Sequence, residues 1–375
     1  MGQLNLIQDT GKIPSEISSK ILTVGPDYHN HKGGIGAVIE LYHKYFETFK
    51  FINTYKGGGF FSKAFYFLKG VSRLIGVLLS DKKIKVIHIH GASNGSFYRK
   101  FIIFLIAKYL FKKKIVYHIH GGGFHIFSEK SNDFSKRLIS FFLRKSDIII
   151  CVSNSWVEYF RKNYKTNIIT VLPNMVDIPE RIERAPRSGI ITFLFLGLVC
   201  ESKGIFDLIH VIGKNKNNYA GRMKLFIGGN GEIKKLNSLI KNYQIEDIVK
   251  YQGWVSKKRK AEVLNSSDVY ILPSYAEGSP ISILEAMSYG MAIISTKVGG
   301  IPELVRENQN GFLIEPGNPG QIEKALDSII SNQGILEKFG SVSESIAQKH
   351  LPVPVLGQLM NIYQSLLTKN TTIPE

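Results

Sequence analysis

The chain has 375 residues, of which 44% are hydrophobic and 21% charged, so its length predicts two domains and its composition excludes a disordered or fibrous protein. Its formal net charge is +18, and its two cysteines are too few for a disulfide framework. The first 12 residues lack the basic and apolar regions of a signal peptide, and the longest apolar run, Phe101–Ala107, is far shorter than the roughly 18 residues that span a bilayer. We therefore expect a cytoplasmic protein that is associated peripherally with the inner face of the cell membrane.

The positive charge is concentrated in the first half. Residues 1–190 carry 29 Lys and Arg against 13 Asp and Glu, whereas the remainder carries 19 against 17. A field concentrated in this way indicates anionic partners: nucleic acid, anionic lipid or phosphorylated ligands. Charge that serves only solubility is the alternative, and the lopsided distribution disfavours it.

Short β-branched or aromatic runs alternate with helical patterns, which favours an α/β fold with parallel sheets. The proline-containing stretch 173–189 divides the runs into two sets and predicts domains at 1–185 and 190–352. Ligands of such sheets bind at the carboxyl ends of the strands. The predicted strands are Ile21–Val24, Val86–His90, Ile115–His120, Ile148–Val152, Ile168–Leu172, Thr192–Leu196, Lys224–Ile227, Val269–Leu272 and Ala292–Ser295.

Two features follow strands of the first set. The glycine loop at 32–36 could bring backbone amides to a phosphate, but it matches neither the dinucleotide fingerprint nor the Walker A pattern, and a structural turn explains it equally well. The segments HIHG and HIHGGG each place two histidines on one strand face. A zinc site is conceivable but disfavoured without a nearby thiolate or carboxylate; one catalytic or substrate-binding histidine is favoured, and polar strand ends remain an alternative.

The turns that follow strands of the second set contain several charged and polar residues that could bind a ligand. Lys203 lies in a Lys-Gly turn from which it could reach a phosphate held by helix-end amides. Ser279 is a predicted N-cap with Pro280 at the first helical position, giving a helix of about three turns that Gly290 terminates. Glu277, just outside this cap, would oppose a phosphate and suits hydroxyl groups better. Glu285 on its own would be read as a solvated helix residue.

In order and spacing, these segments resemble the GT-B-fold retaining glycosyltransferases of family 4, also called glycosyltransferase group 1. The resemblance is tight over 190–320, where it rests on the Lys-Gly turn, GNGE, PSYAEGSPISILEAMSYG, TKVGGIPELV and NGFLIEPGN. It is looser in the first half, through GGIG, HIHGGG, VSNS and VLPNMVD. It implies two Rossmann-like domains facing a cleft, with a carboxyl-terminal tail, 353–375, that crosses back to the first domain.

The resemblance also implies residue roles. His120 would position the transferred sugar, Glu277 would hold its hydroxyls, and Lys203 would neutralise the diphosphate. Further contacts to the donor are implied for Gly34, Glu285 (on the ribose), Asn230, Ser279, Pro280, Ile281, Gly299 and Gly300. One departure is Leu198, where the family commonly has an arginine, so one cation facing the diphosphate is missing.

The implied reaction is retaining transfer of a hexosyl or N-acetylhexosaminyl group from a nucleotide diphosphate sugar. The chain contains no Asp-x-Asp pair, so we expect no essential metal and no other cofactor. The expected acceptor is a lipid-linked saccharide or other oligosaccharide of capsule, O-antigen or exopolysaccharide synthesis. The nucleotide base, the sugar and the linkage stay open.

Two basic, apolar segments, Phe60–Ser80 and Phe97–Phe111, favour contact with an anionic membrane, although both could instead cover their own sheet. Three other functions stay open: a basic nucleic-acid-binding protein, a sugar-nucleotide epimerase of the same fold, and an inactive sugar-binding relative. No zinc-finger, RNP or helix-turn-helix pattern accompanies the charge, so we expect no nucleic acid partner.

Overall fold

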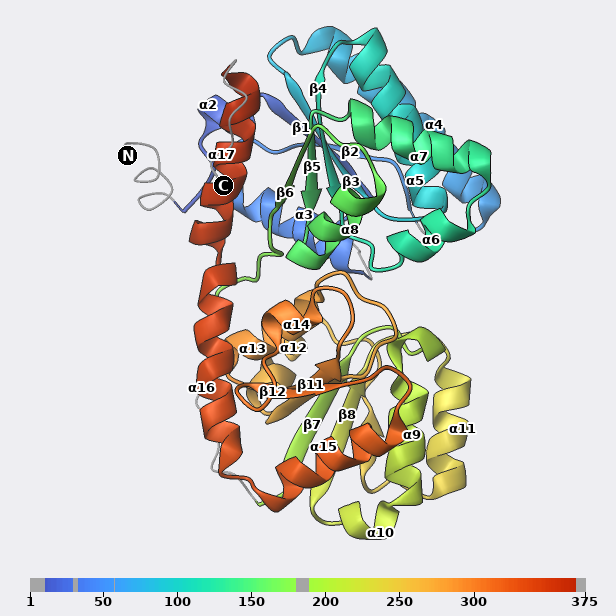
Figure 1. Ribbon diagram of the computed structural model, residues 1–375, viewed down its shortest axis with the longest axis vertical. Coiled ribbons are helices and arrows are strands. Elements are labelled where there is room, and N and C mark those ends of the chain that lie inside the picture. Colours follow the sequence, from blue (N-terminus) through green and yellow to red (C-terminus); the bar gives the residue numbers. More distant parts are fainter. Residues whose placement is uncertain (1–10, 30–32, 57, 180–188, 369–375) are drawn as a thin grey trace. The chain divides into compact units, whose positions relative to one another are not determined.

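The computed structural model describes residues 11–29, 33–56, 58–179 and 189–368 (Figure 1). Contacts divide the chain into two units, Met1–Met175 with Leu351–Glu375, and Val176–His350. The boundary expected at residue 185 lies outside the described residues, as do the amino-terminal segment up to residue 10 and the end of the tail from residue 369.

The first unit contains a six-stranded parallel sheet in the order β2-β1-β3-β4-β5-β6. The strands are β1 (Ile21–Gly25), β2 (Lys50–Asn53), β3 (Val86–Gly91), β4 (Lys114–Ile119), β5 (Ile148–Cys151) and β6 (Ile168–Val171). The helices are α2 (Ser15–Ser18), α3 (Gly34–Tyr45), α4 (Phe60–Ser80), α5 (Gly95–Leu105, continued by a π-helix at Ile106–Leu110), α6 (Phe124–Lys130), α7 (Asp133–Lys145), α8 (Asn154–Asn163) and α17 (Pro352–Leu367). Helices α3 and α17 lie on one side of the sheet, and α4, α5 and α7 lie on the other (Figure 1).

The second unit has the same architecture, with a parallel sheet in the order β12-β11-β10-β7-β8-β9. Its strands are β7 (Ile191–Leu196), β8 (Met223–Gly228), β9 (Val249–Tyr251), β10 (Val269–Leu272), β11 (Ala292–Thr296) and β12 (Gly311–Ile314). Its helices are a 3-10 turn (Glu201–Lys203), α9 (Ile205–Lys214), α10 (Lys216–Tyr219), α11 (Ile233–Tyr243), α12 (Lys257–Asn265), α13 (Ile281–Ser288), α14 (Ile301–Leu304), α15 (Pro319–Ser331), α16 (Ile335–Ala347) and a 3-10 turn (Gln348–His350).

The α/β class with parallel sheets is confirmed, and all nine predicted strands are present. Three further strands, β2, β9 and β12, were missed, and all three are edge strands. An edge strand packs on one neighbour only and stays partly exposed, so it needs no continuous apolar run. Strand β2, for example, buries only Ile52 of its four residues.

The chain turns at Leu351, whose extended backbone separates the 3-10 turn from α17. Helix α17 contacts α2 and β3 within the first unit. Leu359, Ile362 and Tyr363 on this helix are buried. The tail therefore forms part of the core on the side of the sheet that carries the paired histidines.

Candidate active site

The carboxyl edge of the second sheet carries an ion pair between two predicted site residues. The ammonium of Lys203 donates to Oε1 of Glu277 over 2.5 Å, and the hydroxyl of Ser274 donates to the same oxygen over 2.8 Å. The Glu277 side chain is about nine-tenths buried, with 10% exposed, whereas 26% of the Lys203 side chain is exposed. The lysine can therefore meet a ligand while the carboxylate is held from two sides.

Glycines allow the turns around this pair to pack backbone against backbone. Gly204 has φ +66°, and a Cβ there would lie 2.0 Å from the carbonyl oxygen of Pro273. Gly299 has φ +54°, and a Cβ there would lie 1.9 Å from the carbonyl oxygen of Glu277. The amide of Gly300 donates to the carbonyl of Gly278 over 2.7 Å. These contacts fix the loop that carries Glu277.

The GNGE turn packs on the turn after β7. The amide of Val199 donates to the carbonyl of Asn230 over 2.7 Å, and a Cβ at Gly229 would lie 1.8 Å from the carbonyl oxygen of Gly197. Asn230 is partly exposed, and Leu198 is 48% exposed. The turn thus presents a leucine where the family pattern has an arginine.

The helix after Glu277 differs from its prediction in two respects. Its N-cap is Pro280 rather than Ser279, and it has eight residues instead of about three turns. Since the amide of Ile283 bonds to the carbonyl of Pro280, the first unbonded amides are those of Ile281 and Ser282. Pro280 has no amide N–H, and the donor contacts expected for Ser279, Pro280 and Ile281 stay predictions.

Glu285, taken by itself, was expected to be a solvated helix residue, but its carboxylate is paired and partly buried. Its Oε1 accepts a hydrogen bond from the Lys260 ammonium, and only 20% of the Glu285 side chain is exposed. Lys260 comes from α12 and was not singled out in the sequence. Its only signal is the basic run at 257–260, which resembles many solvated helix faces.

In the first unit, Gly34 begins α3 and Gly33 is its N-cap, with extended backbone at φ −168°. Lys32, the preceding residue of the loop, lies outside the described residues. Helix α3 contacts β1, and its first amides lie at the carboxyl edge of the first sheet. This position suits the contact expected for Gly34.

The paired histidines form an array at the same edge. His90 lies opposite His118 in the register of β3 and β4, and His120 follows β4 directly. Nδ1 of His90 lies 2.9 Å from Nε2 of His120, and Nε2 of His88 lies 3.3 Å from Nδ1 of His118. His88, His90 and His118 are at most 1% exposed, whereas His120 is partly exposed. The amide of His120 donates to the carbonyl of Gly91 over 3.0 Å, which links the two strand ends.

Burial keeps the array neutral. It lowers the pKa of His88 and of His120 to about 3 each. It also holds the pKa of His90 and of His118 well below the usual value, helped by the neighbouring imidazoles. His88, His90 and His118 each offer one ring nitrogen within 4.8 Å of the others, a spacing that a metal could use. Sequence reasoning treated the two pairs separately and did not identify this three-histidine group.

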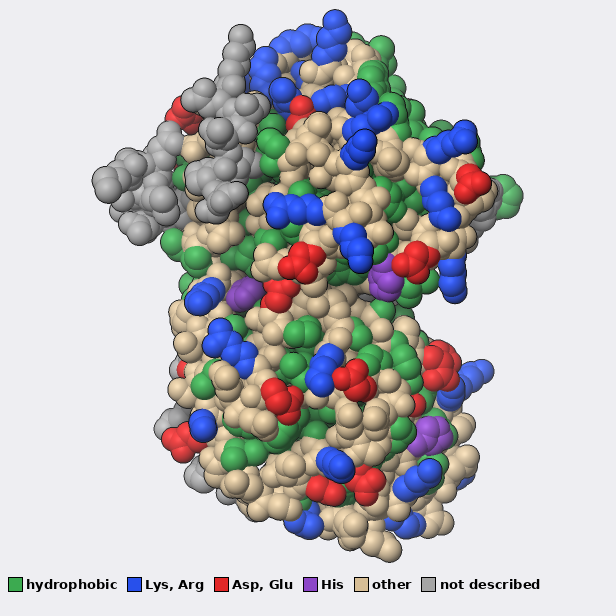
Figure 2. Space-filling view, viewed as in Figure 1, with side chains coloured by type: hydrophobic (Ala, Val, Ile, Leu, Met, Phe, Trp, Pro, Cys, Tyr) green, Lys and Arg blue, Asp and Glu red, His purple; other side chains and the backbone are tan. Residues whose placement is uncertain are grey.

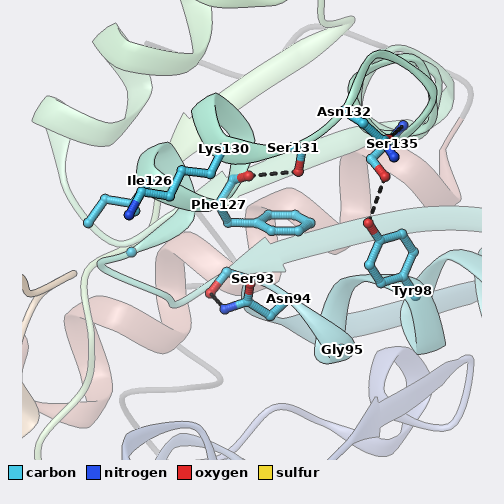
Figure 3. Close-up of a pocket in the computed structure, with 11 residues that line it drawn as sticks. Ser93, Asn94, Gly95, Tyr98, Ile126, Phe127, Lys130, Ser131, Asn132 and Ser135 are labelled. Carbon is cyan, nitrogen blue, oxygen red and sulfur yellow. Dashed lines mark hydrogen bonds between the residues drawn. The ribbon is translucent and has the colours of Figure 1, made fainter.

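A cavity of about 680 Å³ opens beside the loop at 120–123 between β4 and α6, here called the His120 loop (Figure 3). It is lined by residues after β3, by Gly123 after β4, and by the facing ends of α6 and α7. Figure 3 shows the hydroxyl of Tyr98 directed at Ser135, a bond of 2.8 Å. Lys130 is the one charged residue of the described lining.

Two family descriptions match the chain in succession. Glycosyltransferase Family 4 matches residues 43–180, and Glycosyl transferases group 1 matches residues 178–345. A related protein is the UDP-Gal:alpha-D-GlcNAc-diphosphoundecaprenol alpha-1,3-galactosyltransferase of Escherichia coli. It is 29% identical over 269 residues, which cover 66% of this chain and 67% of the relative.

Among solved structures, sucrose-phosphate synthase from Thermosynechococcus elongatus superposes with a TM-score of 0.79 at 15% identity, covering 96% of this chain and all of the other. Anabaena HepE in complex with UDP superposes with a TM-score of 0.72 at 17% identity, covering 92% and 100%. At such identities the likeness shows the fold alone, which is GT-B.

Proposed function

Because the chain belongs to the group 1 glycosyltransferases of family 4, we propose that it transfers a hexosyl or N-acetylhexosaminyl group from a nucleotide diphosphate sugar, with retention, to a lipid-linked saccharide of cell-surface polysaccharide synthesis. The observation that carries this proposal is the Lys203–Glu277 pair at the carboxyl edge of the second sheet. It offers a cation for a diphosphate and a held carboxylate for sugar hydroxyls, beside the first amides of α13.

The proposed chemistry is electrostatic. As the anomeric bond breaks, the leaving diphosphate gains charge that Lys203 and the amides of Ile281 and Ser282 are oriented to stabilise. The acceptor hydroxyl attacks on the face that the diphosphate leaves, and its proton passes to the departing phosphate oxygen. Each of these steps uses fixed cations and dipoles, so the proposal includes no essential metal or other cofactor.

Donor recognition is assigned to the second unit, and Gly34 and His120 of the first unit keep the donor contacts that the family resemblance implies. Glu285 would accept from the ribose hydroxyls after exchanging its bond to Lys260. Lys260 would then be released beside the donor, which is one way to compensate for the cation missing at Leu198. Asn230, Gly299 and Gly300 would contact the donor through the turns described above.

The cavity beside the His120 loop is the proposed entrance for the acceptor. Its hydroxyl and amide groups suit a saccharide, and Lys130 suits a linking phosphate. The E. coli relative is named for a diphosphoundecaprenol acceptor, which supports an acceptor of this class.

Contact with a membrane is proposed for α4. Four large apolar side chains on this helix are 58–86% exposed: Phe61, Phe65, Leu68 and Leu79. At 100° per residue they lie within one narrow stripe. The helix packs on the sheet at Gly70, which is buried: a Cβ there would lie 2.6 Å from the carbonyl oxygen of Asn53 in β2. Exposed Lys69 and Arg73 accompany the apolar stripe, as in an interfacial helix.

The other candidate segment mostly covers its own sheet. Phe97, Ile103, Phe104 and Ala107 are fully buried, so the apolar face of α5 belongs to the core. Lys112 and Lys114 are exposed where β4 begins, at the sheet edge opposite His120. Figure 2 shows Lys and Arg side chains gathered over this end of the first unit. They suit an anionic leaflet better than the donor. Among the described residues, no helix combines the length and the apolar character that spanning a bilayer requires.

A thermal-shift screen with UDP, GDP and their sugars tests donor binding, because a ligand at 100 times its Kd stabilises the fold by about 2.7 kcal/mol. Release of the nucleotide is then measured with and without undecaprenyl-diphosphate saccharides, and after treatment with EDTA. Turnover that depends on acceptor and survives EDTA supports the proposal. Conversion of donor without acceptor indicates an epimerase, and no turnover indicates an inactive relative. Binding that responds only to polynucleotides, and falls steeply with salt, favours the nucleic-acid function.

A further inference from the structure

Four imidazoles form a two-by-two array on the side of the first sheet that α3 and α17 cover. His88 stacks on His90 with ring centroids 4.3 Å apart, and the rings of His118 and His120 lie 3.9 Å apart at a tilt of 32°. Across the strands, each histidine of β3 meets one from β4 or its end through the hydrogen bonds given above. The array thus joins the partly exposed His120 to three side chains that are at most 1% exposed.

The hydrogen bond between His90 and His120 can carry its proton in two ways. Either His90 donates from Nδ1 to Nε2 of His120, or His120 donates from Nε2 to Nδ1 of His90. The second arrangement moves the proton of a neutral His90 to its own Nε2. That atom is buried and has no hydrogen-bond partner among the described residues.

A buried N–H without an acceptor is rarer and more costly than a buried lone pair without a donor. The unpartnered Nε2 of His90 therefore selects donation from its Nδ1. His120 then accepts at Nε2, and its own proton must occupy Nδ1.

Resting on the proposed role of His120, we propose that His90 is a positioning residue that holds His120 as the Nδ1–H tautomer, so that Nδ1–H is a fixed donor for an oxygen of the transferred sugar. Nδ1 has no protein partner in the part of the chain that the structure describes. A donor whose proton is fixed before the ligand arrives needs no reorganisation in the transition state.

The same array could be taken for a metal site, but its charge balance opposes this. The group of three nitrogens includes no carboxylate or thiolate among the described residues, and all three side chains are buried. A divalent ion there would leave two uncompensated positive charges near Lys100, whereas buried charges need partners. Neutral imidazoles joined by hydrogen bonds avoid that cost.

The tautomer can be measured without any substrate. Long-range ¹H–¹⁵N NMR on the full chain labelled at histidine distinguishes protonated from unprotonated ring nitrogens, and H120N identifies the His120 signals. We expect Nδ1–H for both His90 and His120, unchanged by one equivalent of Zn²⁺ after dialysis against EDTA. A wild-type His120 that carries its proton on Nε2 overturns the proposal, and so does Zn²⁺ that shifts the nitrogens of the array.

Kinetics test the consequence. H90F removes the donor, and H90N restores an N–H near the place of Nδ1. We expect H90F to lower kcat by about 10- to 100-fold, by analogy with the loss of partners that orient metal-ligating histidines. The KM for donor should stay within about twofold, and His120 should show a mixture of tautomers. H90N should recover most of kcat.

Y363F is the matched control, because it removes the hydroxyl 2.6 Å from Nδ1 of His88 and leaves the His90–His120 bond intact. If H90F and Y363F lost kcat equally, and in proportion to their loss of thermal stability, His90 would have only a structural role and the proposal would be overturned. If the wild-type protein transferred no sugar, the proposed function would fail, while the NMR experiment would still decide the tautomer.

Discussion

Truncating the two carboxylates of the candidate site, Glu277 and Glu285, should affect two different constants, turnover and donor affinity. Glu277→Ala removes a side chain that is assigned to the transferred sugar, and Glu285→Ala removes one assigned to the ribose. Contacts to the ribose persist unchanged through the reaction, whereas contacts to the sugar tighten as charge develops. We therefore expect Glu285→Ala to weaken donor binding, and Glu277→Ala and His120→Ala to lower turnover.

The assigned contacts set the size of these effects. Each carboxylate is assigned a hydrogen bond to a hydroxyl of the donor, and a hydrogen bond to a charged group is worth about 1.5–3 kcal/mol. That corresponds to roughly 10- to 150-fold, in kcat for Glu277→Ala and in donor Kd for Glu285→Ala. The Lys203–Glu277 pair is partly exposed on the lysine side, so we expect only about 1 kcal/mol of stability to be lost with it.

The assay combines initial rates at saturating donor with calorimetric titration of the nucleotide diphosphate. Glu277→Gln is the matched control, since its amide oxygen can still accept from Lys203 and Ser274 and should retain more activity than alanine. Equal loss of donor affinity in all three alanine variants, with unchanged turnover at saturation, would refute the assignment of roles.

Three further predictions concern the frame of the site. Gly299→Ala should lower both Tm and donor affinity, because a φ of +54° costs an L-residue about 1–2 kcal/mol and the new Cβ would displace the neighbouring loop. An unchanged Kd for the nucleotide diphosphate would contradict this. The free energy of unfolding should fall as the pH drops from 6.5 toward 3, by up to about 1.4 kcal/mol per pH unit for each of His88 and His120. The reason is that their pKa in the folded protein lies below the unfolded value, so the unfolded chain binds more protons in this range. A free energy of unfolding, measured in urea, that stays constant between pH 6.5 and 5 would exclude this effect. Replacing Phe61 and Phe65 by serine should reduce sedimentation with anionic vesicles without changing donor binding, and wild-type protein that binds no vesicles at low salt would refute the membrane contact.

The sequence by itself determined the alternation of strands and helices, the family and the turns that carry the chemistry. These features are local: a buried parallel strand needs a continuous apolar run, and a tight turn needs its glycine, so each leaves a mark in the residues that form it. Helix α4 was bounded correctly for the same reason. The edge strands β2, β9 and β12 left no such mark, because a half-exposed strand tolerates polar residues.

Only the tertiary structure decided which side chains are partners. The sequence marked Glu277 and Lys203 but not the bond between them. It gave no signal for Lys260, since a lysine in a basic helix looks alike whether or not a partly buried carboxylate faces it. Likewise, the histidine pairs read as two separate strand ends until the register of β3 and β4 brought them together under Tyr363, 275 positions away from His88. Burial and pairing depend on contacts between distant segments, and so does the protonation of the array: it is the folded sheet, not the residue type, that removes water from these imidazoles and keeps them neutral.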